Sequence, residues 1–236
     1  MSSAPRSGAR STTAHSRLSS AQPRNDEPRP RLEGHDHYVF GVFLVPILVR
    51  EEDRVFYQEL DLVATRERLV TVRKTPELGH PFDPTPAQEA ARRDDTRAGL
   101  LVYRLVDLIA EYFLDLVDAI DDEIDELEDG IESWTSRQVS GRISVLRHDL
   151  LQVRRTVAPT RDAIRRIVDH RIDIGEGPEL LPRDIELDFA DVHDKLLRAR
   201  DGLDLTRDLL ASATTTRPRS RMTRTTSPGG SSSLPR

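Results

Sequence analysis

The sequence predicts an α/β fold in which a small, incomplete mixed sheet is joined to long coiled-coil-like helices. A Val-, Phe-, Ile- and Leu-rich region over residues 37–73 is typical of β-strands. Apolar residues then recur at alternating three- and four-residue steps through most of residues 97–213, which is the pattern of coiled-coil packing. Charged residues make up 32% of the chain, a content that suits long solvated helices better than a compact globule.

The two ends of the chain have a different composition. Residues 1–30 are rich in Ser, Arg, Pro and Ala without apolar periodicity, so we expect a disordered N-terminal segment. Its arginines and serines, with no acid before Asp26, also loosely resemble a transit peptide. Residues 214–236 consist largely of Thr, Arg, Ser, Pro and Gly with no apolar face, and we expect a disordered tail there.

Residues 31–96 are interpreted as the strand-rich part of the domain. The apolar run 37–49 predicts a strand that is buried on both faces. Residues 55–63 and 69–72 alternate more clearly between apolar and polar positions and predict two further strands. Three strands from so short a region imply a small sheet, either mixed or antiparallel.

A proline-rich connector is expected over residues 75–96. Proline lacks the N–H group that a helix interior or a central strand needs. The connector is therefore predicted to avoid both, because it contains four prolines: Pro76, Pro81, Pro84 and Pro86.

Residues 97–213 are predicted to form three long helices. The first break is expected at 136–141, and the second where Gly175, Gly177, Pro178 and Pro182 interrupt the pattern. Pro159 is expected to kink the second helix because its ring displaces a backbone hydrogen bond. Each helix carries a seam, that is, a row of mostly apolar residues at heptad spacing. The seam residues are, in the first helix, Phe113, Val117, Ile120, Ile124, Leu127, Ile131 and Trp134; in the second, Val139, Ile143, Leu146, Leu150, Val153, Val157, Thr160, Ile164 and Ile167; and in the third, Phe189, Val192, Leu196, Ala199, Leu203, Thr206 and Leu210.

Composition argues against several classes of function. The chain has no cysteine, which removes disulfides, thiolate metal sites and cysteine nucleophiles. Its formal net charge of -6 makes nucleic acid a poor partner. No nucleophile-elbow sequence or glycine-rich phosphate loop is present, so we do not expect an enzyme. The longest apolar run, residues 38–49, is too short to span a bilayer, and no signal peptide is visible.

The most prominent chemical feature is an acidic stretch without any Lys or Arg between Arg104 and Arg137. Carboxylates spaced by one helical turn repel one another, and hard cations such as Mg²⁺ prefer carboxylate and water oxygens. A magnesium-responsive surface and a plain solvated acidic face are both compatible with this stretch. Its carboxylates are Asp107, Glu111, Asp115, Asp118, Asp121, Asp122, Glu123, Asp125, Glu126, Glu128, Asp129 and Glu132.

Several segments in this order and spacing resemble the cytosolic domain of the CorA family of magnesium and cobalt transporters. The helical matches are Leu101-Val-Tyr-Arg-Leu-Val-Asp107, Ile120-Asp-Asp-Glu-Ile-Asp-Glu-Leu-Glu-Asp129, Leu146-Arg-His-Asp-Leu-Leu-Gln-Val-Arg-Arg-Thr-Val-Ala-Pro-Thr-Arg-Asp162 and Phe189-Ala-Asp-Val-His-Asp-Lys-Leu196. Upstream, residues 29–33 and 38–40 resemble the start of a family strand. The resemblance covers roughly residues 28–213.

The resemblance implies a function and a site. It implies a homopentamer at the plasma membrane, with this part in the cytoplasm and the membrane reached only through a pore segment. In the family, divalent cations pass through the pore, and cytosolic Mg²⁺ bound between neighbouring subunits holds the channel shut. Asp191 falls on the long-helix acid of that regulatory site and Asp107 on a second acid nearby. Asp194 and Glu111 lie about one helical turn beyond them and are candidates for the same metal cluster.

The sequence also departs from the family pattern. It lacks the family's opposing acidic pair before residue 28, the opening strands of the sheet and both transmembrane helices. It also lacks the Gly-Met-Asn signature, since Met1 and Met222 are the only methionines. A gene product truncated or frame-shifted before the pore would explain both ends. The alternative to magnesium sensing is a soluble coiled-coil scaffold or interaction protein without a metal function.

Overall fold

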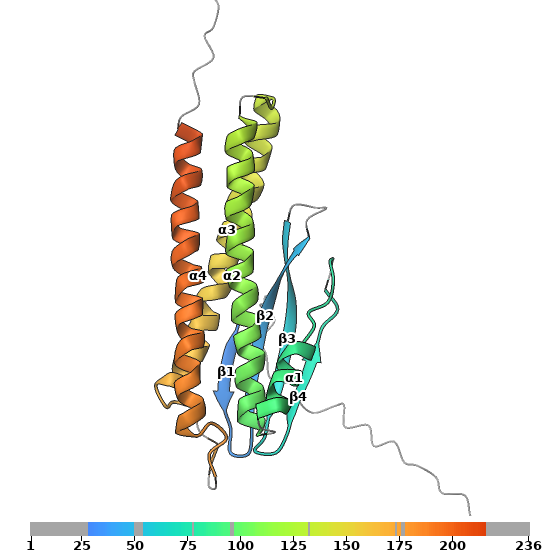
Figure 1. Cartoon of the computed structure of the whole chain (residues 1–236), viewed down its shortest axis with the longest axis vertical. Helices are drawn as coiled ribbons and strands as arrows, with labels where there is room; N and C mark the ends of the chain where they lie inside the picture. Colours follow the sequence, from blue (N-terminus) through green and yellow to red (C-terminus); the bar gives the residue numbers. More distant parts are fainter. Residues whose placement is uncertain are drawn as a thin grey trace, which may run out of the picture.

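The structure is a computed structural model, and it describes residues 28–49, 54–76, 78–94, 97–131, 133–172, 174–175 and 178–215. A small sheet lies against two of three long helices, and the third helix packs along these two on the side away from the sheet (Figure 1). The disordered segments predicted at 1–30 and 214–236 fall mostly outside the described residues, but residues 214–215 belong to the last helix rather than to a disordered tail. The elements are β1 (Arg31–Gly34), β2 (Val39–Val49), β3 (Arg54–Ala64), β4 (Leu69–Arg73), α1 (Thr85–Asp94), α2 (Ala98–Gly130), α3 (Ser136–Val168) and α4 (Arg183–Thr215).

The sheet is a meander in the order β1-β2-β3-β4, and every neighbouring pair is antiparallel. The three predicted strands are confirmed as β2, β3 and β4, and the short edge strand β1 is a fourth that periodicity alone did not give. The mixed arrangement is not found among the described strands. β2 is the most buried strand, as its apolar run predicted, with Val42 and Phe43 at most 3% exposed although they point to opposite faces.

The connector expected over residues 75–96 contains a helix, α1, which is a correction to the sequence interpretation. Pro86 is compatible with this helix because it lies in the first turn, where a backbone N–H has no intrahelical partner to lose. The carboxylate of Asp83 accepts hydrogen bonds from the backbone N–H and the hydroxyl of Thr85, at 3.0 and 2.6 Å. Proline at a helix start thus favoured the helix that it was expected to exclude.

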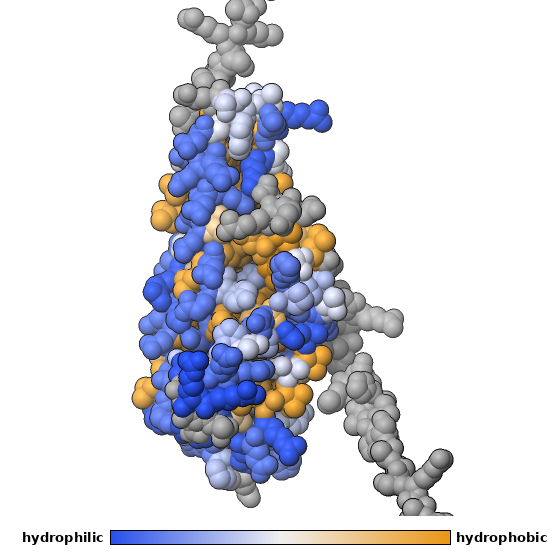
Figure 2. Space-filling model, turned by 45° about the vertical axis from the view of Figure 1, so that its right-hand side comes forward, coloured by the Kyte–Doolittle hydropathy of each residue, from blue (hydrophilic) through white to orange (hydrophobic). Residues whose placement is uncertain are grey.

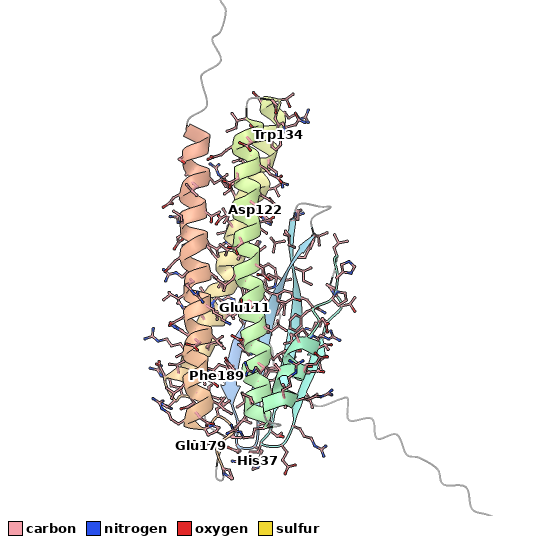
Figure 3. The ribbon with its side chains drawn as sticks, viewed as in Figure 1. His37, Glu111, Asp122, Trp134, Glu179 and Phe189 are labelled. Atoms are coloured by element: carbon pink, nitrogen blue, oxygen red, sulfur yellow. The ribbon has the colours of Figure 1, made fainter. Side chains whose placement is uncertain are left out.

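The three predicted long helices are present, each 33 residues long. α2 and α3 form an antiparallel hairpin, and α4 returns alongside so that α2 and α4 run parallel to each other (Figure 1). Figure 3 shows Trp134 at the tip of the hairpin and Phe189 near the start of α4. The three seams meet in one core, in which Phe113, Leu146 and Leu196 are at most 1% exposed.

The first helix break lies earlier than the sequence indicated. It was expected at 136–141, but α3 already begins at Ser136. Thr135 and Gln138 form a capping box in which each side chain bonds the other residue's backbone N–H, at 3.4 and 2.9 Å. Gly141 is tolerated inside the helix because it faces open space. α3 also continues through Pro159 without ending there.

On the face that Figure 2 shows, hydrophilic residues cover most of the surface and apolar residues are grouped in patches, the larger of them near the middle. Two valines of the edge strand β4, Val70 and Val72, are more than half exposed. No helix within the described residues combines the length and the apolar character needed to cross a bilayer.

Candidate functional site at the α2–α4 seam

The parallel packing of α2 against α4 places the sequence-predicted carboxylates along one seam. Near its lower end the rings of Tyr103 and Phe189 meet edge to face, with centroids 5.6 Å apart. Higher up, Gly202 removes the side chain that would otherwise collide with Val117, since a Cβ there would lie 2.7 Å from a Val117 methyl carbon. These contacts fix the register of the two helices and bring α4 polar groups opposite those of α2.

Lys195 is the polar centre of this seam. Its ammonium lies 2.6 Å from Oδ1 of Asp107 and also forms an ion pair with Glu111. The side chains of Lys195 and Asp107 are 19% and 21% exposed, and that of Glu111 is 44% exposed. Figure 3 places Glu111 about midway along α2. Asp107 and Glu111 are one helical turn apart, so a single cation between them relieves their mutual repulsion.

The surroundings keep Lys195 charged. Burial by itself lowers the pKa of the Lys195 ammonium, because a charge is less stable away from water. The hydrogen bonds and the negative charges of Asp107 and Glu111 outweigh that effect, and the pKa lies above its ordinary value. Lys195 is therefore a fixed cation in the seam at neutral pH.

Asp191 and Asp194 lie on the solvent side of the same lysine. Both are exposed, and the side chain of Asp194 is 73% exposed. With Lys195, Arg198 and Asp201 they line an open hollow along α4. Nδ1 of His193 lies 3.5 Å from Oδ1 of Asp194. The structure thus places Asp107 and Glu111 in contact with Lys195, and Asp191 and Asp194 beside the same lysine in the open hollow.

The donor set suits a hard divalent cation in kind, since Asp107, Glu111, Asp191 and Asp194 offer carboxylate oxygens. Among the described residues, however, no three His, Cys, Asp or Glu side chains lie close enough to hold a metal ion by themselves. The inner pair of carboxylates, Asp107 and Glu111, is already neutralised in part by Lys195. A cation at this seam therefore needs bridging waters or groups from another molecule.

Lys195 was not singled out as a functional residue from the sequence. The sequence nevertheless offered a reason to consider it, because Lys195 directly follows Asp194 and lies one helical turn beyond Asp191. It is also one of only two lysines in the chain. What the sequence lacked was the register between α2 and α4, which decides that Lys195 faces Asp107 and Glu111.

Most of the acidic stretch of α2 is a solvated face. Beyond Glu111, two of its carboxylates have partners in the bundle: Glu123 pairs with Arg142 at 3.0 Å, and Asp121 accepts a hydrogen bond from Thr206 at 2.5 Å. The others beyond Glu111 are exposed, namely Asp115, Asp118, Asp122, Asp125, Glu126, Glu128 and Asp129.

Comparison with known proteins decides the family. A sequence model described as CorA-like Mg²⁺ transporter protein matches residues 16–228, which is most of the chain. The chain belongs to the CorA-like family. This CorA-family chain is 24% identical over 190 residues to the cobalt/magnesium transport protein CorA of Thermotoga maritima, covering 79% of this chain and 52% of that protein. It is 26% identical over 185 residues to the putative metal ion transporter YfjQ of Bacillus subtilis, covering 77% and 54%.

Solved structures agree on the fold. The soluble domain of CorA from Methanocaldococcus jannaschii superimposes with a TM-score of 0.63 at 17% identity, covering 80% of this chain and 73% of that one. The cytoplasmic domain of ZntB from Vibrio parahaemolyticus superimposes with a TM-score of 0.60 at 14% identity, covering 81% and 72%. The CorA-family chain spans about half the length of the two curated relatives. The resemblance inferred from the sequence motifs is therefore confirmed at the level of family and fold.

Proposed function

We propose that this CorA-family chain is the cytosolic, magnesium-sensing part of a CorA-type transporter of Mg²⁺ and Co²⁺. The observation that carries the proposal is the α2–α4 seam, where Lys195 pairs with Asp107 and Glu111 and shares an open hollow with Asp191 and Asp194. The family to which the chain belongs supports the class of cargo. Passage of ions would need a membrane-spanning pore, which no helix among the described residues supplies.

The sensing role follows from the chemistry of the outer pair of carboxylates, Asp191 and Asp194. Asp191 and Asp194 are exposed, so they are available to a cation that keeps its water shell, as Mg²⁺ usually does in proteins. A regulatory Mg²⁺ would be held there largely through water, between this chain and a neighbouring copy in a homopentamer. Cation binding would then stabilise the assembled state, because a ligand that binds only one state shifts the equilibrium toward it.

The test is a magnesium titration of the full chain followed by thermal unfolding and by sedimentation. For a site of millimolar Kd, linkage gives a gain of about 1.4 kcal/mol at roughly ten times that concentration. The response should exceed that to NaCl of matched ionic strength, because screening alone also relieves carboxylate repulsion. Asp191→Ala should weaken the response more than Glu128→Ala, since both residues are exposed but Glu128 lies on the solvated face of α2. Equal responses to MgCl₂ and NaCl, unchanged in Asp191→Ala, would remove the sensing role.

A second candidate is a helical scaffold that binds a partner without regard to cations. Three leucines on α4 favour it, because Leu187, Leu205 and Leu209 are 57%, 62% and 44% exposed. Exposed leucines along one helix are typical of a surface covered by another helix. Association that is independent of magnesium concentration would support the scaffold over the sensor.

A further inference from the structure

Lys195 holds the position where a cation shared by α2 and α4 would neutralise Asp107 and Glu111. Its ammonium contacts both carboxylates, and its side chain is only 19% exposed. The other lysine, Lys74, pairs with Glu59 through a side chain that is 57% exposed. The seam ion pair is thus a sheltered contact between two helices, whereas the Lys74 pair belongs to the surface of the sheet.

An ammonium and a divalent cation compete for the same carboxylate oxygens. Lys195 is tethered by α4, so its effective concentration at the inner pair is high and requires no binding from solution. A Mg²⁺ ion between Asp107 and Glu111 would have to displace the ammonium, since two cations at one carboxylate pair repel each other. Asp191 and Asp194 lie instead in the open hollow, which Arg198 also lines and where Nδ1 of His193 lies 3.5 Å from Oδ1 of Asp194.

We propose that Lys195 is a specificity-determining residue of the candidate site, acting as a built-in monovalent cation. It joins α2 to α4 without metal and keeps divalent cations from Asp107 and Glu111. This inference rests on the proposed sensing function, which it deepens by naming what limits cation affinity. Its consequence is that a chain without the lysine charge depends on a divalent cation to neutralise Asp107 and Glu111.

The experiment compares full-length Lys195→Met with the unmodified chain, because methionine keeps the aliphatic stem and removes the charge. Each protein is melted across a MgCl₂ series and a NaCl series of matched ionic strength, with far-UV circular dichroism as the readout. Lys195→Met should melt lower without divalent cation and should reach half of its magnesium response at a concentration about tenfold lower than the unmodified chain. Lys195→Arg, which keeps a cation, should behave as the unmodified chain, and so should Lys74→Met.

A second variant separates charge competition from simple loss of packing. Adding Asp107→Asn to Lys195→Met removes one of the freed carboxylates, so the extra magnesium sensitivity should be lost. If Lys195→Met unfolds without cations, magnesium but not NaCl should restore its helical signal. Failure of both salts to restore it, or equal magnesium midpoints in Lys195→Met and the unmodified chain, would overturn the role of Lys195.

The two proposals fail in different ways. If the unmodified chain responds specifically to magnesium and Lys195→Met responds at the same midpoint, sensing stands and the inference about Lys195 falls. If only Lys195→Met responds, the inference stands and sensing by the unmodified chain falls. If neither responds, both are overturned.

Discussion

The hydroxyl of Thr206 on α4 lies 2.5 Å from Oδ1 of Asp121 on α2, although the two residues are 85 positions apart in the chain. Thr206 is completely buried, and its hydroxyl also lies 2.8 Å from the carbonyl oxygen of Gly202 in its own helix. The carboxylate is the stronger acceptor because it is charged. This hydrogen bond joins the acidic half of α2 to α4 by a neutral donor, above the level of Lys195.

Thr206→Val should destabilise the chain by about 1–2 kcal/mol, since valine keeps the volume but leaves the Asp121 carboxylate without its donor. Urea unfolding followed by circular dichroism measures the change. Thr160→Val is the matched control: Thr160 is 1% exposed, and its hydroxyl donates only within α3, to the carbonyl of Thr156 at 2.8 Å. Equal losses in the two variants would contradict an interhelical role for Thr206.

Gly202→Ala should lower stability although alanine is the better helix former. A methyl group at position 202 meets Val117 at 2.7 Å, so the two helices must separate, and overpacking typically costs about 1–3 kcal/mol. Gly141→Ala is the opposite case, because nothing lies within 4 Å of the added carbon. That variant should gain about 0.5–1 kcal/mol from helix propensity alone. Melting temperatures that move in the same direction in both variants would contradict the close approach at Gly202.

Asp149→Asn should change how stability depends on pH. Burial raises the pKa of the Asp149 carboxyl, and the Val55 N–H at 3.4 Å, together with the charges of Arg54, His148 and Arg142, offsets only part of that rise. The folded state therefore binds the Asp149 proton more tightly than the unfolded chain does. The stability from this group is present at acidic pH and is lost as pH rises above the ordinary aspartate range near 4.

Asparagine stays neutral and can still accept from Val55, so Asp149→Asn should melt higher than the unmodified chain at neutral pH and converge with it in acid. Thermal melts across that pH range measure the difference. Asp125→Asn, on the exposed face of α2, should show no such convergence. A pH profile of Asp149→Asn parallel to that of the unmodified chain would exclude Asp149 as the source.

Thr135→Ala should weaken the start of α3 by about 1 kcal/mol, because it removes the side chain that accepts the Gln138 N–H. Thr135→Ser keeps the acceptor and should lose much less. Trp134, the only tryptophan, is adjacent to this cap and 37% exposed, so its fluorescence reports the hairpin tip directly. An unchanged unfolding midpoint in Thr135→Ala would show that the capping box contributes little.

The helical part of the fold could be predicted because its periodicity is strong. Phe113, Ile124, Val153 and Leu203 were all assigned to the seams, and each is at most 2% exposed. The predictions that were wrong rested on residues whose local effect on the backbone can go two ways. A proline such as Pro86 can end a helix or lie in its first turn. Here the hydrogen bond from the Thr85 N–H to the Asp83 carboxylate marks the start of a helix. The candidate site needed the relative register of α2 and α4, which no pattern within one helix contains.

The parallel course of α2 and α4 has a consequence for the order in which the chain folds. Glu123 and Arg142 meet across a short connection, whereas Asp107 and Lys195 are 88 positions apart. Since closing a longer loop has a larger entropic cost and contacts of high sequence separation form slowly, the contacts of α4 with α2 should form late. During synthesis α2 would be complete before α4 has left the ribosome, with the α2 surface around Val117 and Ile120 still open. The helix that carries Lys195 is then the last to dock, and it closes the core.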